Sequence, residues 1–176
     1  DDIDGWDMID YVGMVEFYND FNNFELEITM PAKFVVWSTG ELQNPADVLS
    51  KEIVARFEKS KTSDEVVKII SQADYQLGKV TSPGKKSTWK FKAVSVPDVA
   101  FAASDHANWD ATSLVVDKQT SRRVQVSAVY PDSAVHYEKV AKITRDAVEF
   151  MSFEWPGYPF PYPQATVFAN GRKTGG

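Results

Sequence analysis

The sequence predicts an α+β protein: a mainly antiparallel β domain of sandwich or saddle shape with a small helical insertion, followed by a short strand–helix–strand segment. Three observations lead to this prediction. Residues 22–30 alternate apolar and polar side chains, the period of a strand with one buried face. Asn44-Pro45 opens a stretch whose apolar residues recur every four positions, as in an amphipathic helix. From Ala134 a second helical period begins, and an apolar strand pattern follows over residues 165–169.

The first strands carry one polar face. Pro31 ends the alternating run, residues 34–38 form a second β-rich run, and Thr39-Gly40 predicts a turn after it. Two neighbouring strands with one polar face indicate an antiparallel sheet. Further strands are expected later in the chain, at residues 88–93, 99–103, 112–117 and 123–130, with 99–103 predicted as a central strand and a hairpin turn at 118–121.

Residues 44–86 are predicted to form a helical insertion and loop. Leu49, Ile53 and Phe57 lie four residues apart and form one apolar face. Thr62 and Glu65 match a capping box, which predicts a second helix through Ile70.

A long helix is expected over residues 134–154. Its apolar stripe should pack on the strands at 124–130 and 165–169 and leave an apolar patch that promotes self-association. The change from β-rich to helix–strand pattern near Pro131 is a candidate domain boundary.

Composition excludes several classes of protein and site. The net charge of −6 argues against a nucleic-acid partner, because binding phosphates usually needs a basic surface. The absence of cysteine excludes disulfides and thiolate metal sites. No apolar run reaches the roughly 18 residues that a membrane-spanning helix needs, so no membrane span is expected.

Three groups of residues could suggest chemistry. Ser104-Asp105-His106 contains the residue types of a catalytic triad, but adjacent side chains diverge, so we expect a loop with local hydrogen bonds. The acidic start around Asp2, Asp4 and Asp7 is expected to be a solvated turn, since the frame lacks the glutamate of a calcium loop. Aromatic residues are frequent near the start, and they suit core packing or, alternatively, stacking on sugars: Trp6, Tyr11, Phe17, Tyr18, Phe21 and Phe24.

Several segments, taken in order, resemble aminopeptidase-N-like zinc metallopeptidases. Residues 22–42 resemble the family's strand, Val-Pro, strand, Ser-Asn-Gly segment, and 89–105 resemble the last strands of its amino-terminal β domain. Residues 124–130, the helix that follows, and Tyr-Pro-Phe-Pro-Tyr-Pro at 158–163 resemble the start of its thermolysin-like catalytic domain. The match covers almost the whole chain, apart from the insertion at 44–86.

The resemblance implies a division and a function. Residues 1–110 would belong to the amino-terminal β domain, and 111–176 to the junction and start of the catalytic domain, before the zinc motif. Gly175 and Gly176 would begin the loop that anchors the substrate. The full-length enzyme would use zinc to remove amino-terminal residues from peptides, and the remainder of its catalytic domain would be this segment's partner.

This chain by itself is expected to be inactive. It has two histidines, His106 and His136, and neither is followed by glutamate, so no H-E-x-x-H helix can form and no catalytic residue, metal ligand or cofactor is assigned within it. The alternative from another class is a stand-alone β-sandwich module that binds glycan or protein through its aromatics. That alternative requires two or more exposed, coplanar aromatic faces with polar groups beside them.

Overall fold

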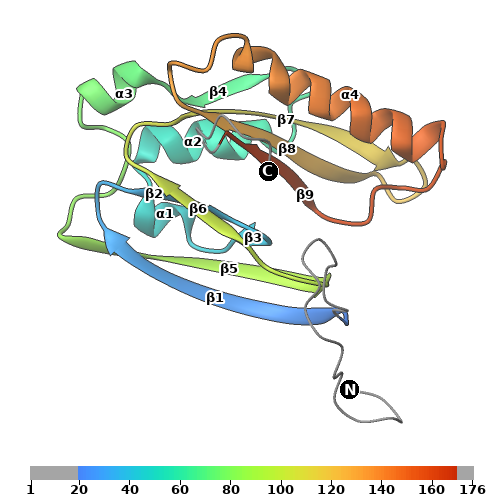
Figure 1. The fold of residues 1–176 in the computed structure, drawn as a ribbon, viewed down its shortest axis with the longest axis horizontal. Helices are drawn as coiled ribbons and strands as arrows, with labels where there is room; N and C mark the ends of the chain where they lie inside the picture. Colours follow the sequence, from blue (N-terminus) through green and yellow to red (C-terminus); the bar gives the residue numbers. More distant parts are fainter. Residues whose placement is uncertain (1–19, 170–176) are drawn as a thin grey trace, which may run out of the picture.

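The computed structural model describes residues 20–169 and has an α+β fold of mostly antiparallel sheets, which confirms the predicted fold class (Figure 1). The strands are β1 (Asn22–Pro31), β2 (Val35–Ser38), β3 (Glu41–Leu42), β4 (Val67–Ile70), β5 (Lys86–Val96), β6 (Phe101–Ser104), β7 (Asn108–Asp117), β8 (Arg122–Tyr130) and β9 (Gln164–Phe168). The helices are α1 (Pro45–Val48), α2 (Lys51–Ser60), α3 (Gln72–Gln76), the 3₁₀ turn η1 (Tyr137–Lys139) and α4 (Val140–Phe153).

A four-stranded sheet in the order β4-β7-β8-β9 organises the second half of the chain. β7 and β8 form an antiparallel hairpin, whereas β8 and β9 are parallel. A parallel neighbour needs a crossover, and η1 with α4 supplies it. Figure 1 shows α4 lying along one face of this sheet, where Ala141 and Val148 of the helix are buried.

The opposite face of the sheet packs on the rest of the molecule. A large core joins residues of β2, α2, β4, β5, β7 and β8, and it includes the fully buried Trp89 and Ile53. Trp37 of β2 meets Trp109 of β7 edge to face, with ring centroids 5.8 Å apart. Below this core in Figure 1 lies the long ribbon of β1 and β5, which pairs further with β3.

β1 confirms the alternation read from the sequence. Its inward side chains are Leu26, Ile28 and Met30, which pack against the large core. On the outward face Glu27 lies 2.9 Å from Lys90 of β5, and such exposed cross-strand pairs contribute little stability but keep a strand face soluble.

Two predictions about secondary structure are wrong. The second helix expected through Ile70 is instead strand β4, because Ile69 and Ile70 are buried in the large core and β4 completes a ladder with β7. The capping box lies later, between Ser71 and Asp74 at the start of α3. The run at 99–103 is not a central strand, since within residues 20–169 β6 pairs only with β2.

The later elements agree with the predicted pattern except at the start of the long helix. Strands β7, β8 and β9 overlap the expected runs, whereas α4 begins at Val140, after η1, and not at residue 134. The helix packs against all three strands. The predicted division between residues 110 and 111 falls inside β7, and β4 of the predicted insertion belongs to the same sheet as β8 and β9. No helix within residues 20–169 is long and apolar enough to cross a membrane.

Large apolar side chains are exposed on α4 and after it, but the residues concerned lie outside the predicted stripe. Ile143 and Phe150 of the helix are more than half exposed, and Trp155 and Tyr158 in the following turn are about three-quarters exposed. Self-association through an apolar patch stays a prediction.

We expect Gly40→Ala to destabilise the fold strongly. Gly40 has φ +88°, and an added Cβ would lie 2.5 Å from the carbonyl oxygen of Lys92 in β5. The left-handed conformation of residue 40 and the overlap of the added Cβ with the backbone of β5 should together lower the free energy of unfolding by about 2–4 kcal/mol. Gly78→Ala is the matched control, because Gly78 has φ +64° but nothing within 4 Å of the added methyl group. Its cost should be about 1–2 kcal/mol in the same urea titration, and equal costs would contradict the close approach.

Candidate functional site

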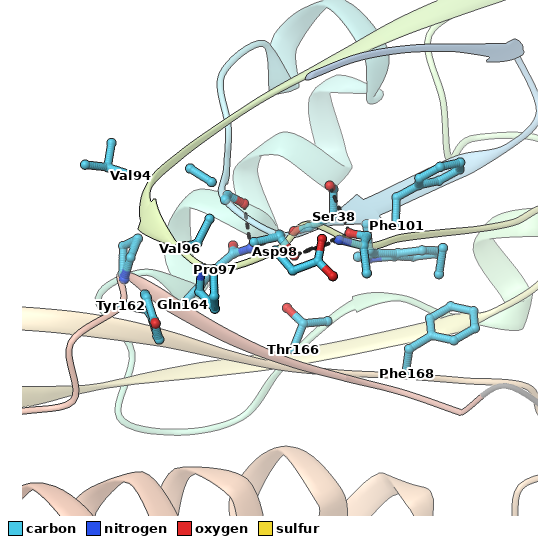
Figure 2. Close-up of a pocket in the computed structure, with 17 residues that line it drawn as sticks. Ser38, Val94, Val96, Pro97, Asp98, Phe101, Tyr162, Gln164, Thr166 and Phe168 are labelled. Atoms are coloured by element: carbon cyan, nitrogen blue, oxygen red, sulfur yellow. Dashed lines mark hydrogen bonds between the residues drawn. The ribbon is translucent and has the colours of Figure 1, made fainter. Parts of the chain in front are cut away.

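A mostly apolar groove of about 430 Å³ lies between β6, the turn that precedes it, and β9 (Figure 2). We call it the β6–β9 groove. Its walls are mostly apolar and come from segments far apart in the chain: Trp37, Val94, Val96, Pro97, Phe101, Tyr162, Pro163 and Phe168. Figure 2 shows Phe101 on one side of the opening and Phe168 and Thr166 on the other.

Hydrogen bonds between β2 and the turn before β6 hold one wall of the groove. The Ser38 hydroxyl donates to the Ala100 carbonyl oxygen at 3.1 Å, and the Ala100 amide donates to the Thr39 hydroxyl at 3.1 Å. These contacts fix the start of β6 beside the end of β2, so two segments that are hydrogen-bonded to each other form this wall.

Gln164 joins the two walls. Its side-chain amide nitrogen donates to the carbonyl oxygens of Ser38, at 2.9 Å, and Gly40, at 2.6 Å. Gln164 begins β9, so these bonds connect the four-stranded sheet to the end of β2 and the turn between β2 and β3. The bridge therefore sets the relative position of the β9 and β2–β6 sides of the groove.

The chemistry of the groove is that of apolar recognition. Asp98 is the single acidic or basic residue among its lining residues, and its carboxylate accepts a hydrogen bond from the Val99 amide. The indole N–H of Trp37 is buried and has no acceptor among residues 20–169. The groove therefore offers mainly apolar surface, and its lining residues bring no acid–base pair together.

The groove also borders two edge strands. β6 pairs only with β2, and β9 pairs only with β8, so each strand has one edge without a ladder partner in the described part of the chain. Unpaired strand edges favour binding of an extended segment through its backbone.

The Ser104-Asp105-His106 segment is a loop with local hydrogen bonds, as predicted. The His106 amide donates to the Ser104 hydroxyl at 3.2 Å, while the imidazole Nδ1 lies 2.8 Å from Asp105. The Lys33 ammonium lies 2.7 Å from the same carboxylate. Hydrogen bonds from Lys33 and then His106 lower the pKa of Asp105 to about 2. Asp105 therefore serves an ion pair rather than a nucleophile.

The other predicted site residues are not brought together. His136 has a left-handed backbone, lies exposed before η1, and has Glu138 4.0 Å away. Residues 20–169 hold no cluster of three histidine or carboxylate side chains that could bind a metal. Gly175, Gly176 and the acidic start at Asp2, Asp4 and Asp7 lie outside the described residues.

A buried polar pair was missed by the reading of the sequence. Asp110 of β7 is 2% exposed, and its carboxylate accepts a 2.6 Å hydrogen bond from the Tyr130 hydroxyl on β8. Its other oxygen has no partner among the described residues. Burial raises the pKa of Asp110, against the opposing effects of the Tyr130 hydrogen bond and the charge of Lys68. Asp110 lies before the run predicted as a strand, 112–117, and nothing in the sequence indicated that β7 would begin at Asn108 and bury this side chain.

Comparison with protein-family models, curated proteins and solved structures finds no significant match for this chain.

We expect the free energy of unfolding of the Asp110→Asn variant to increase relative to that of wild type as pH rises. The folded pKa of Asp110 lies above its unfolded value, so its favourable contribution is complete at acid pH and is lost as pH rises through the folded pKa. Free energies of unfolding measured in urea between about pH 3 and pH 7 test the slope, a range that spans the ordinary carboxyl pKa.

Asp105→Asn is the control with the opposite sign. The folded pKa of Asp105, about 2, lies below its unfolded value, so its contribution is present at neutral pH and lost as pH falls through that value. The Asp105 variant should therefore lose stability relative to wild type as pH rises. If the free energies of unfolding of the two variants, each relative to wild type, change with pH in the same direction, the assigned directions of the two pKa shifts are wrong.

Gln164→Leu should lower the free energy of unfolding by about 1–3 kcal/mol, because it leaves two carbonyl oxygens without their donor. Amide exchange in β9 should accelerate as well, since the bridge holds the start of that strand. The matched control is Gln43→Leu, whose side chain is exposed and bonds only the nearby Glu41 carbonyl oxygen. The control should stay within about 0.5 kcal/mol of wild type. A Gln164 variant as stable as the control would contradict the bridge.

Proposed function

We propose that this chain is a non-catalytic segment of an aminopeptidase-N-like zinc metallopeptidase, an enzyme that removes amino-terminal residues from peptides. The observation that carries the proposal is the order of elements. An antiparallel β region is followed by the hairpin β7–β8, the crossover helix α4 and the parallel strand β9. The proline–tyrosine turn at residues 158–163 enters β9, in the place that the resemblance assigns to it.

In this proposal the chain braces the enzyme and borders the entrance for peptide substrates. Residues 1–110 form part of the amino-terminal β domain, and residues 111–176 form the junction and the start of the catalytic domain. Gly175 and Gly176 begin the loop that anchors the substrate. The rest of the catalytic domain is then the direct partner of this segment.

The chemistry would come from outside this chain. Zinc held by two histidines and a glutamate would activate water, with a second glutamate as general base. The described residues do not fit such a site, because they contain no cluster of three potential ligands. His106 is instead engaged with Asp105, and no step of the reaction is assigned to it.

The stand-alone binding module is the second candidate, and the groove aromatics are what favour it. Its requirement for coplanar exposed rings is not supported by the ring pairs found within residues 20–169. Trp37 and Phe168 are tilted by 49°, Phe160 and Tyr162 by 75°, and Trp37 itself is buried. Stacking on a sugar would need a flatter and more open platform.

The coding sequence downstream of Gly176 in the parent gene provides the test. We expect a Gly-Met-Glu-type run followed by H-E-x-x-H and a more distant glutamate. The parent protein should release amino-terminal residues from peptide anilides, lose activity with a chelator and regain it with stoichiometric zinc. The isolated 176-residue chain with added zinc is the control and should show background hydrolysis only. A parent sequence with neither motif, or a parent without bound zinc, would exclude an active enzyme of this family.

A further inference from the structure

A polar cavity of about 540 Å³ lies between the turn that joins β4 to α3 and the connection that joins β8 to α4. We call residues 131–139 of this connection, which include η1, the cap. The cap contributes Asp132 and Glu138 to the cavity wall, and β8 contributes Tyr130. The Tyr130 hydroxyl donates a hydrogen bond to the buried carboxylate of Asp110, so this carboxyl group lies directly behind the wall.

Few contacts hold the cap to the sheet. Four of its backbone amides donate to carbonyl oxygens of the cap itself. In the described part of the chain, one hydrogen bond joins the cap to the sheet, from the Asn108 side-chain amide to Asp132 at 3.4 Å. The Tyr137 ring packs on the Tyr130 ring, with centroids 5.8 Å apart. His136 has φ +72°, which is unfavourable for a residue with a side chain, so the closed cap also carries backbone strain.

Negative charge is concentrated where the cap meets the sheet. Asp110 is 2% exposed, and one of its carboxylate oxygens has no partner among the described residues. Burial raises the pKa of the Tyr130 hydroxyl, and three nearby carboxylates add to the rise: Asp110, Glu138 and Asp132. Two of these carboxylates belong to the cap, so an ionised Asp110 repels the segment that covers it.

The positive charge that opposes this repulsion is that of Lys68 on β4, which lines the same cavity. His136 of the cap lines it too and adds a positive charge when it is protonated, whereas the described lining residues from α3 are uncharged and none comes from α4. Burial raises the pKa of Asp110 against the Tyr130 hydrogen bond and the charge of Lys68, and Glu138 adds a further rise. Burial therefore outweighs the attraction of Lys68.

We propose that residues 131–139 form a pH-sensitive cap, which is closed over Asp110 while this carboxyl group holds its proton and opens when the group ionises. A buried carboxylate with a single hydrogen-bond partner is costly, and contact with water removes that cost. The cap is the element that can move, because β7 and β8 are joined by a full ladder. The proposal does not depend on the proposed enzymatic function, since it uses only these contacts.

The direction of the pH effect follows from the two states of the cap. When the cap is open, Asp110 is hydrated and its pKa is the ordinary value of about 3.9. When the cap is closed, the pKa of Asp110 is higher. The closed state is therefore favoured at acid pH, and its advantage is lost as pH rises through the closed-state pKa. The equilibrium constant for opening should rise by up to about tenfold per pH unit between the two pKa values and then level off.

Amide hydrogen exchange of the 176-residue chain tests this proposal. The rates in residues 131–139, each divided by the intrinsic rate at the same pH, should rise between about pH 4 and pH 7. Amides of β7 and β8 should change less. Asp110→Asn cannot ionise and should abolish the rise, whereas Asp105→Asn, in the loop after β6, should keep it. Normalised rates that are flat in wild type, or that rise equally in Asp110→Asn, would overturn the proposal.

A surface substitution keeps the test decisive even if Asp110→Asn does not fold. The Glu138 side chain is 54% exposed, so Glu138→Gln should leave the core intact while it removes one of the two cap charges. Its normalised exchange near pH 7 should fall by about twofold, the size of one exposed charge–charge interaction. The matched control is Glu154→Gln, at the exposed end of α4, which should behave as wild type. Equal exchange in the Glu138 and Glu154 variants would contradict the proposal.

Discussion

Burial of β7 and β8 on both faces is the constraint on which the rest of the structure depends. Trp109 and Ala111 of β7 face the large core, whereas Leu114 belongs to the cluster beneath α4. A strand pair that is apolar on both sides must be covered on both sides, because each exposed face would leave large side chains in water. The helix α4 covers one face, and the strands and helices of the first half of the chain cover the other. The layered architecture follows from this single requirement.

The groove is a consequence of the way these layers meet. β6 and β9 belong to different sheets and do not pair, and Gln164 of β9 is hydrogen-bonded instead to the end of β2 and the turn after it. The result is a concavity with apolar walls and free strand edges, suited to holding an extended segment. Its lining residues bring no acid–base pair together.

Local patterns predicted most of the strands and the long helix, since their apolar periods are unambiguous. Residues 22–30 alternate strictly, and α4 carries a clear helical stripe. The prediction failed at residues 62–70. Thr62 and Glu65 match the pattern of a helix start, but Ile69 and Ile70 are buried in strand β4. It also failed to separate a central strand from an edge strand at β6, because a short apolar run has no period that reveals its neighbours.

By itself the sequence determined the fold class, the element types with strong periodicity, and the absence of an H-E-x-x-H motif and of cysteine chemistry. These properties depend on residue identity and local spacing. Only the tertiary structure decided that β4 joins β7, that Asp110 is buried against Tyr130, and that Trp37, Phe101 and Phe168 form one groove. Each of these depends on contacts between residues far apart in the chain, and strand pairing and burial at such distances leave no trace in local spacing.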